Sequence, residues 1–152
     1  MKSTLLRFLA AGLATLALGS APALAQETPT KLNGGKVISV EEGKKLLDGG
    51  GAQFVDTRAV LNFGKGHVPG AVAVAYKEKS DKAENFDASQ DSFELAKLPA
   101  DKAKTVVFYS DGPTGWKSYK AAVLAIKAGH KNVMYMRGGF SDWTAKGYPA
   151  ES

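Results

Sequence analysis

The chain has 152 residues, of which 44% are hydrophobic and 23% charged, and its formal net charge at pH 7 is +5. These proportions are typical of a globular protein, exclude a disordered or collagen-like chain, and suit a single domain. The sequence contains no cysteine, which excludes disulfides, thiolate metal sites and a thiol nucleophile. Its two histidines are far apart with no ligand spacing around them, so we expect no metal and no cofactor.

Residues 1–25 have the three parts of a secretory signal peptide. Lys2 and Arg7 give a positive start, Phe8 to Leu18 form an eleven-residue apolar run, and an A-x-A cleavage site ends at Ala25. The alternative is a membrane anchor, but a spanning helix needs about 20 apolar residues. We therefore expect cleavage after Ala25 and export, to the periplasm of a Gram-negative bacterium or otherwise by secretion.

The remaining chain alternates short apolar runs with helical patterns. Residues 26–36 are polar and contain Pro29 and a glycine pair, so they are predicted to be a loose, flexible arm. Ser39 and Glu42 have the S-x-x-E spacing of a capping box. In chain order we expect strand 37–39, helix 40–47, strand 53–56, helix 59–63, strand 71–75, a helical turn in 93–98, strand 105–109, helix 116–128, strand 132–136 and helix 141–146.

The central strand and the helix after it carry the clearest signals. Residues 105–109 read TVVFY, which suits a strand buried in the middle of a sheet, and the next helix has an apolar stripe that begins at Tyr119. Residues 77–92 are polar with little to bury and are predicted to be a surface excursion. The alternation of strands and helices predicts one α/β domain with a largely parallel sheet over residues 37–150.

Four separated segments resemble the rhodanese-like domain family. Asp56-Thr57-Arg58, followed by Asn62-Phe63, resembles the family's D-x-R…E-F segment, with Asn62 where glutamate is common. Residues 66–71, GHVPGA, resemble its G-H-I-P-G-A turn, residues 106–109 its central strand, and residues 138–143 its closing G-G-x-x-x-W. The resemblance covers about residues 37–149 and implies a single domain with a five-stranded, mainly parallel sheet flanked by helices.

The resemblance also shows where the chain departs from the family. In the family a cysteine after the central strand carries a sulfane sulfur as a persulfide and passes it to a thiol or cyanide; here that position is Ser110. A serine hydroxyl cannot form a persulfide, and a serine nucleophile needs an adjacent general base. Asp111 is its neighbour in sequence, but neighbours at a strand end usually point apart, so we name no confident catalytic residue and expect no hydrolase.

The loop after the central strand is the candidate anion site. Its glycines allow several amide groups to point inward, and the following helix adds the positive end of its dipole. The alternative is an ordinary capped turn, and a carboxylate at Asp111 would repel anions. At the rim, Asp56 and Arg58 either face an anion or hold the loop by a charge-assisted hydrogen bond. The candidate loop residues are Ser110, Asp111, Gly112, Thr114, Gly115, Trp116 and Lys117.

Four other side chains have a structural and a functional interpretation. His67 lies in a glycine- and proline-rich turn and is predicted to be structural, although it could carry a proton. His130 follows a helix C-terminus, where an imidazolium would suit the dipole. Trp143 is predicted to pack in the core. Trp116 is either an exposed contact surface or packed over its own helix.

The sequence therefore predicts an exported, non-catalytic binding protein that holds a small oxyanion, or an anionic group of a partner protein, in the retained loop. The alternatives are a sulfurtransferase that acts with a partner's cysteine and a structural subunit of an exported complex. No Lys/Arg run stands out, so we expect no nucleic-acid partner, and no membrane contact after signal cleavage.

Overall fold

The computed structural model describes residues 26–152, so the predicted signal peptide lies outside the described residues. No helix in this part of the chain combines the length and the apolar character that crossing a membrane requires. The strands are β1 (Lys36–Ile38), β2 (Ala52–Asp56), β3 (Val72–Ala73), β4 (Thr105–Tyr109) and β5 (Asn132–Met136). The helices are α1 (Val40–Gly49), α2 (Val60–Lys65), α3 (Trp116–Lys127) and α4 (Gly139–Ala145), with 3-10 turns η2 (Ala88–Gln90) and η3 (Leu95–Lys97).

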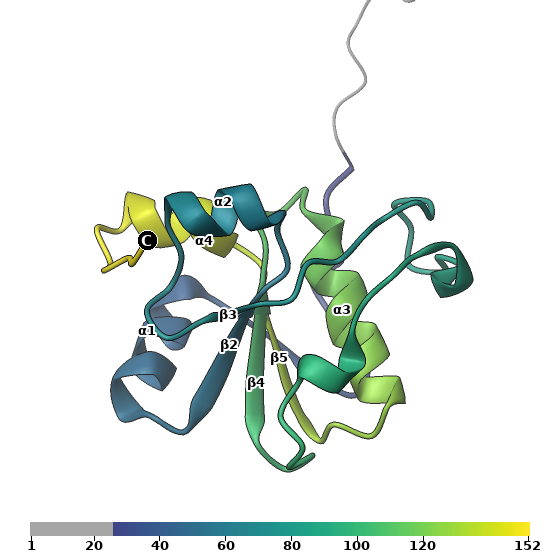
Figure 1. The fold of residues 1–152 in the computed structure, drawn as a ribbon, viewed down its shortest axis with the longest axis horizontal. Coiled ribbons are helices and arrows are strands. Elements are labelled where there is room, and N and C mark those ends of the chain that lie inside the picture. Colours follow the sequence, from purple (N-terminus) through teal and green to yellow (C-terminus); the bar gives the residue numbers. More distant parts are fainter. Residues whose placement is uncertain (1–25) are drawn as a thin grey trace, which may run out of the picture.

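The five strands form one parallel sheet in the order β1-β5-β4-β2-β3. Helix α3 lies on one side of the sheet, and α1 and α4 lie on the other (Figure 1). This arrangement confirms the predicted α/β fold. Because parallel strands end at the same edge, the segments after β2 and β4 meet at one end of the domain.

The central strand β4 divides the core into two clusters. Successive side chains of a strand point to opposite faces. Accordingly, Val106 and Phe108 pack with the α3 side of the core, whereas Val107 and Tyr109 pack with the side that holds Trp143. These four side chains are fully buried and only Thr105, at the start of β4, is partly exposed, which is why the run is apolar from Val106 onward.

Several element boundaries differ from the prediction. The predicted capping box is confirmed: Ser39 is the N-cap of α1, and its hydroxyl accepts a hydrogen bond from the Glu42 amide, so β1 ends one residue earlier, at Ile38. The regular pairing of β3 covers two residues only, although the Val74 amide still donates to the Asp56 carbonyl. Helix α4 begins at Gly139, earlier than expected, and the predicted turn in 93–98 is the short η3.

The segment before β1 is not the loose arm that its composition predicted. Leu32 is buried in the α3 side of the core, and the Thr28 amide donates to the Pro113 carbonyl at 2.8 Å. Polar composition hid these contacts because they are made mainly by main-chain groups and one hydroxyl. We call residues 26–30 the arm below.

The excursion over residues 77–92 was predicted to have little to bury, but it contains a buried network of polar side chains. The Asp91 carboxylate accepts hydrogen bonds from the Tyr76 hydroxyl and from the amide and hydroxyl of Ser80. Lys120 of α3 is fully buried beneath it, with its Nζ 2.8 Å from both Glu78 Oε2 and Ser80 Oγ. A buried polar network, which apolar patterning does not show, fixes the excursion on α3.

Candidate functional site

The candidate site is the loop that joins β4 to α3, residues 110–115. Ser110 follows β4 directly and is 2% exposed. Helix α4 holds the start of the loop, since the Phe140 amide donates to the Ser110 carbonyl and the Ser141 amide to the Asp111 carbonyl, both at 2.9 Å. Gly139 has a φ of +65°, and a Cβ there would lie 2.6 Å from the Ser110 carbonyl oxygen. Only glycine therefore allows α4 to approach the loop this closely.

The second half of the loop brings the Ser110 side chain to the beginning of α3. The Gly115 amide donates to the Gly112 carbonyl at 2.9 Å, which closes a turn. A Cβ on Gly115 would lie 2.8 Å from Ser110 Oγ, so the hydroxyl is directly beside the N-cap of α3. Gly115 supplies no capping side chain, and the first amides of a helix have no partner within it. The hydroxyl and these amides thus form one cluster of hydrogen-bond donors.

Charged side chains of both signs surround this cluster. The Asp111 side chain is 72% exposed, and its Oδ1 lies 3.8 Å from Arg58 Nη1. Lys117 is half-buried in the first turn of α3, and Thr114 is exposed beside it. The rim is therefore close to neutral, and the helix amides, which point their N–H dipoles outward, supply the fixed positive potential.

Asp56 and Arg58 form a buried pair at the end of β2. Arg58 Nε and Nη2 donate to the Asp56 carboxylate at 3.0 and 2.7 Å, and Nη2 also donates to the Gly66 carbonyl at 2.6 Å. Desolvation acts against the Arg58 charge, but the hydrogen bond and charge of Asp56 outweigh it and raise the guanidinium pKa. The pair holds its loop by a charge-assisted hydrogen bond, as one of the two interpretations predicted, and little of the Arg58 charge is left for a ligand.

Trp116 is not an exposed contact surface. Its side chain is buried against Tyr119 in an edge-on arrangement, with ring centroids 5.5 Å apart. The indole Nε1–H donates to the Gln26 carbonyl at 2.9 Å, so the ring connects α3 with the arm. The sequence could not show that the arm returns to cover it.

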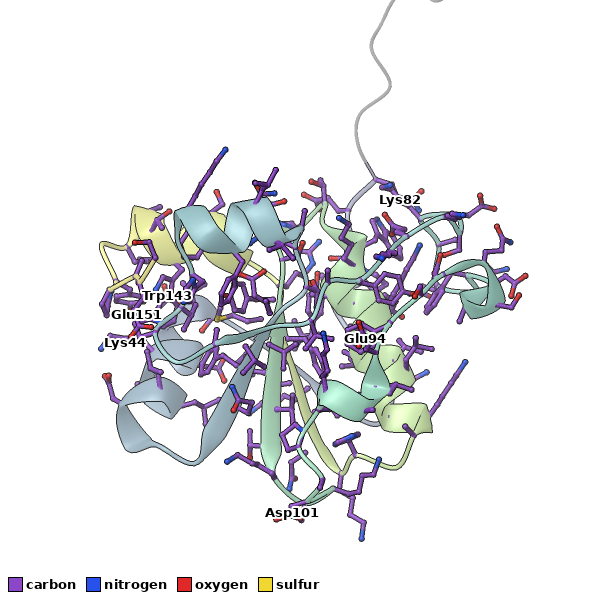
Figure 2. All side chains as sticks on the ribbon, in the orientation of Figure 1. Lys44, Lys82, Glu94, Asp101, Trp143 and Glu151 are labelled. Atoms are coloured by element: carbon purple, nitrogen blue, oxygen red, sulfur yellow. The ribbon has the colours of Figure 1, made fainter. Side chains whose placement is uncertain are left out.

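Trp143 packs in the core as predicted. It is fully buried in α4, contacts Phe54 edge-on, and donates its indole N–H to the Pro149 carbonyl at 2.7 Å. In Figure 2 Trp143 lies on the same side of the view as Lys44 and Glu151. Lys82, in the excursion, and Glu94, just after it, lie on the opposite side.

The two histidines have structural environments. His67 Nδ1 is 2.8 Å from the Phe63 carbonyl oxygen, and its ring stacks on Phe63 with centroids 3.7 Å apart. His130 is buried, and desolvation together with the charge of Lys102 lowers its pKa. Burial and a neighbouring cation therefore favour the neutral ring over the imidazolium that would suit the helix dipole. Across residues 26–152 no cluster of His, Cys, Asp or Glu could hold a metal ion.

Sequence reasoning missed the residues that reach the loop from outside it. Thr28 of the arm contacts the Pro113 carbonyl of the loop, and Arg137, just after β5, holds Thr28 in turn. Neither stands in a motif: Thr28 lies in a polar, proline-containing segment, and Arg137 is a single charge before the Gly138-Gly139 pair. Only the folded chain brings them together.

The comparisons with known proteins agree with this geometry. The profile described as the rhodanese-like domain matches residues 39–146, and the chain belongs to that family. No protein in the comparison with proteins of curated function matches the chain.

Solved structures of the same fold include three informative relatives. The Alr3790 protein of Anabaena sp. has a TM-score of 0.56 and 21% identity, over 76% of this chain and 80% of that one. A thiosulfate sulfurtransferase from Pseudomonas aeruginosa has a TM-score of 0.55 and 26% identity, and the match spans 76% of this chain but only 20% of the enzyme. The polysulfide-sulfur transferase homodimer of Wolinella succinogenes has a TM-score of 0.56 and 18% identity, over 78% and 80% of the two chains.

Proposed function

We propose that this chain is an exported, non-catalytic member of the rhodanese-like family that binds a small oxyanion, or an anionic group of a partner protein, at the start of α3. The observation that carries the proposal is the residue at the end of the central strand. Where the family carries sulfur on a cysteine, this chain has Ser110, and the 152 residues include no cysteine that could take its place.

The serine does not replace the cysteine chemically. A free thiol has a pKa of about 8.5, which a helix terminus and nearby cations lower further, and its sulfur forms an S–S bond with a donor. A hydroxyl offers neither property and needs a general base. Within residues 26–152, no hydrogen bond joins the Ser110 hydroxyl to a histidine or carboxylate; His67 binds the Phe63 carbonyl, and Asp56 is occupied by Arg58. The Ser110 hydroxyl therefore has no general base that could activate it as a nucleophile.

The donor cluster remains suited to holding an anion. A hydroxyl and the unpaired amides of a 12-residue helix converge beside Gly115, and Lys117 adds a positive charge in the first turn. Helix N-termini bind phosphate, sulfate and carboxylate groups by these means. Asp111 weakens the binding of highly charged ligands, which favours a monoanion or a dianion of modest charge density.

The test is a thermal-shift screen with thiosulfate, sulfite, sulfate, phosphate and arsenate. A ligand that binds only the folded state raises the melting temperature by mass action. We expect stabilisation of the wild type by at least one oxyanion and a smaller shift in Lys117→Gln, which removes the charge but keeps a polar side chain only one atom shorter. A flat response to all five anions contradicts the small-oxyanion form of the proposal and favours a partner protein or a structural role.

A second candidate is sulfur transfer with a cysteine from a partner protein, and the family relationship supports it. Ser110→Cys tests whether the donor cluster is intact, and the wild type, assayed with and without a thiol protein, separates the two candidates. If the donor cluster is intact, the variant gains thiocyanate formation from thiosulfate and cyanide, while the wild type stays at the blank without protein. Thiocyanate formation by the wild type alone contradicts the non-catalytic proposal. If wild type plus a candidate thiol protein forms thiocyanate, the second candidate is supported.

A further inference from the structure

The arm contacts the candidate site at two places. The indole Nε1–H of Trp116 donates to the Gln26 carbonyl at 2.9 Å, and the Thr28 amide donates to the Pro113 carbonyl at 2.8 Å. One contact is in the first turn of α3 and the other is in the middle of the loop. The arm therefore spans the two segments whose relative position determines the donor cluster.

Thr28 uses its full hydrogen-bonding capacity in these contacts. Its side chain is nearly inaccessible, at 2% residue exposure. Oγ1 donates to the Pro113 carbonyl at 3.0 Å, which leaves its two lone pairs to the Tyr135 hydroxyl at 2.7 Å and Arg137 Nε at 3.1 Å. The Thr28 carbonyl in turn accepts from Arg137 Nε and Nη2, at 3.2 and 2.9 Å. Because every hydrogen-bonding group of Thr28 has a partner, the arm is a specifically packed part of the domain and not a loose surface contact.

The loop is thus held from two sides. Main-chain amides of α4 donate hydrogen bonds to the carbonyls of Ser110 and Asp111. Within the loop, the Gly115 amide donates to the Gly112 carbonyl. The Pro113 carbonyl is held by Thr28 of the arm, and the arm is held in turn by the indole of Trp116 at the start of α3. Without the arm, the second half of the loop would keep only its internal turn.

We infer that the arm is a clamp that belongs to the binding site, with Thr28 and Arg137 as positioning residues that fix Pro113 and Trp116 and so keep the α3 amides aimed at the ligand. The clamp role in anion binding rests on the proposed function. The contact between the arm and the loop does not depend on that function, so the contact and its role in anion binding are tested by different measurements.

The decisive variant is Thr28→Val in the full chain. Valine keeps the β-branched shape, the amide and the carbonyl that accepts from Arg137, but removes the hydroxyl. The Tyr135 hydroxyl then loses its bond to Thr28, and Arg137 Nε keeps only the carbonyl of its two acceptors on Thr28. Thr28→Ser restores the hydroxyl. Thr30→Val makes the same chemical change at an exposed position of the same arm and is the matched control.

The readout that needs no ligand is the Trp116 indole N–H resonance, with the Trp143 indole, which is bonded to Pro149, as an internal reference. The second readout is calorimetric titration with thiosulfate and with sulfate. We expect Thr28→Val to shift the Trp116 resonance, speed hydrogen exchange of the loop amides, and weaken anion binding by roughly tenfold, about 1.4 kcal/mol. Thr28→Ser and Thr30→Val should leave all three unchanged.

Each outcome decides a definite point. An unshifted Trp116 resonance in Thr28→Val overturns the clamp. A shifted resonance with unchanged anion affinity overturns its role in binding. If the wild type binds neither anion, the proposed function fails for these ligands, and the clamp is then judged by the resonance and the exchange rates alone.

Discussion

The closest approach in the loop, between Gly115 and Ser110, gives the sharpest prediction. A methyl group on Gly115 would lie 2.8 Å from Ser110 Oγ, 3.0 Å from Ser110 Cβ and 3.2 Å from the Gly112 carbonyl oxygen. Rotating the hydroxyl does not relieve the contact with Cβ. The Ser110 main chain cannot retreat easily, because Phe140 holds its carbonyl. Gly115→Ala therefore forces the loop and the start of α3 apart.

The magnitude follows from two opposing effects. Overpacking of this kind costs about 1–3 kcal/mol. The φ of Gly115 is −88°, which alanine adopts readily, so the loss of unfolded-state entropy returns about 0.4–1 kcal/mol. We expect a net loss of about 1–2 kcal/mol in the free energy of unfolding, with anion binding reduced at least tenfold.

Urea unfolding and calorimetric titration measure the two effects. Gly64→Ala is the matched control, since Gly64 is in helix α2 with nothing within 4 Å of a Cβ, and it should be neutral or stabilising. The double variant Ser110→Gly/Gly115→Ala removes the clashing side chain and should recover stability. If Gly115→Ala is as stable as the wild type and binds anions equally well, the close contact and the site built on it are both refuted.

Three further predictions concern the rest of the domain. Desolvation alone would raise the pKa of Asp91, but its hydrogen bonds from Ser80, Tyr76 and two amides outweigh that and hold it at about 2. Because this is below the unfolded value of about 3.9, the contribution to stability is complete above pH ~4 and is lost as the pH falls towards 2. Urea unfolding between pH 2 and 5 should show that slope in the wild type and a weaker one in Asp91→Asn. Lys120→Met removes the buried partner of Glu78 and leaves it only the exposed Lys82, so it should destabilise the fold by about 3 kcal/mol, with Lys120→Met/Glu78→Gln recovering much of the loss; equal stabilities of the two variants would speak against a buried pair. Arg58→Lys loses the forked contact with Asp56 and the bond to Gly66 and should lower the melting temperature by several degrees while Lys65→Arg, on the exposed end of α2, does not.

The parts of the fold that could be predicted from the sequence are those set by local patterns. The apolar run Thr105–Tyr109 and the strand Asn132–Met136 lie where they were expected, because burial on both faces leaves a continuous apolar signal. The Ser39–Glu42 capping box marked the start of α1 to the residue. Helix and strand ends without such chemistry, as at α4 and β3, were less well predicted.

The candidate site was predictable only as a list of loop residues. The position of Ser110 at the end of the central strand followed from the sequence, and the hydrogen-bonded pair of Asp56 and Arg58 was one of two interpretations. The burial of Trp116 and the role of Thr28 depend on contacts between residues about 85–90 positions apart. No periodicity or motif reports such contacts, because they are formed by main-chain carbonyls that every residue carries.

The two ends of the described chain have a practical consequence. Gln26 meets Trp116 in the first turn of α3, so this end of the described chain lies beside the loop. Glu151 pairs with His67 through two main-chain hydrogen bonds, which places the C-terminus near α2 and α4 (Figure 1). A purification tag, fusion partner or surface linker joined directly to Gln26 will stand next to the loop, whereas one at the C-terminus will stand near α2 and α4. Since the chain has no cysteine, affinity measurements on an immobilised chain should attach it through a single cysteine introduced by Lys104→Cys, at the opposite end of β4, to leave the loop towards solution.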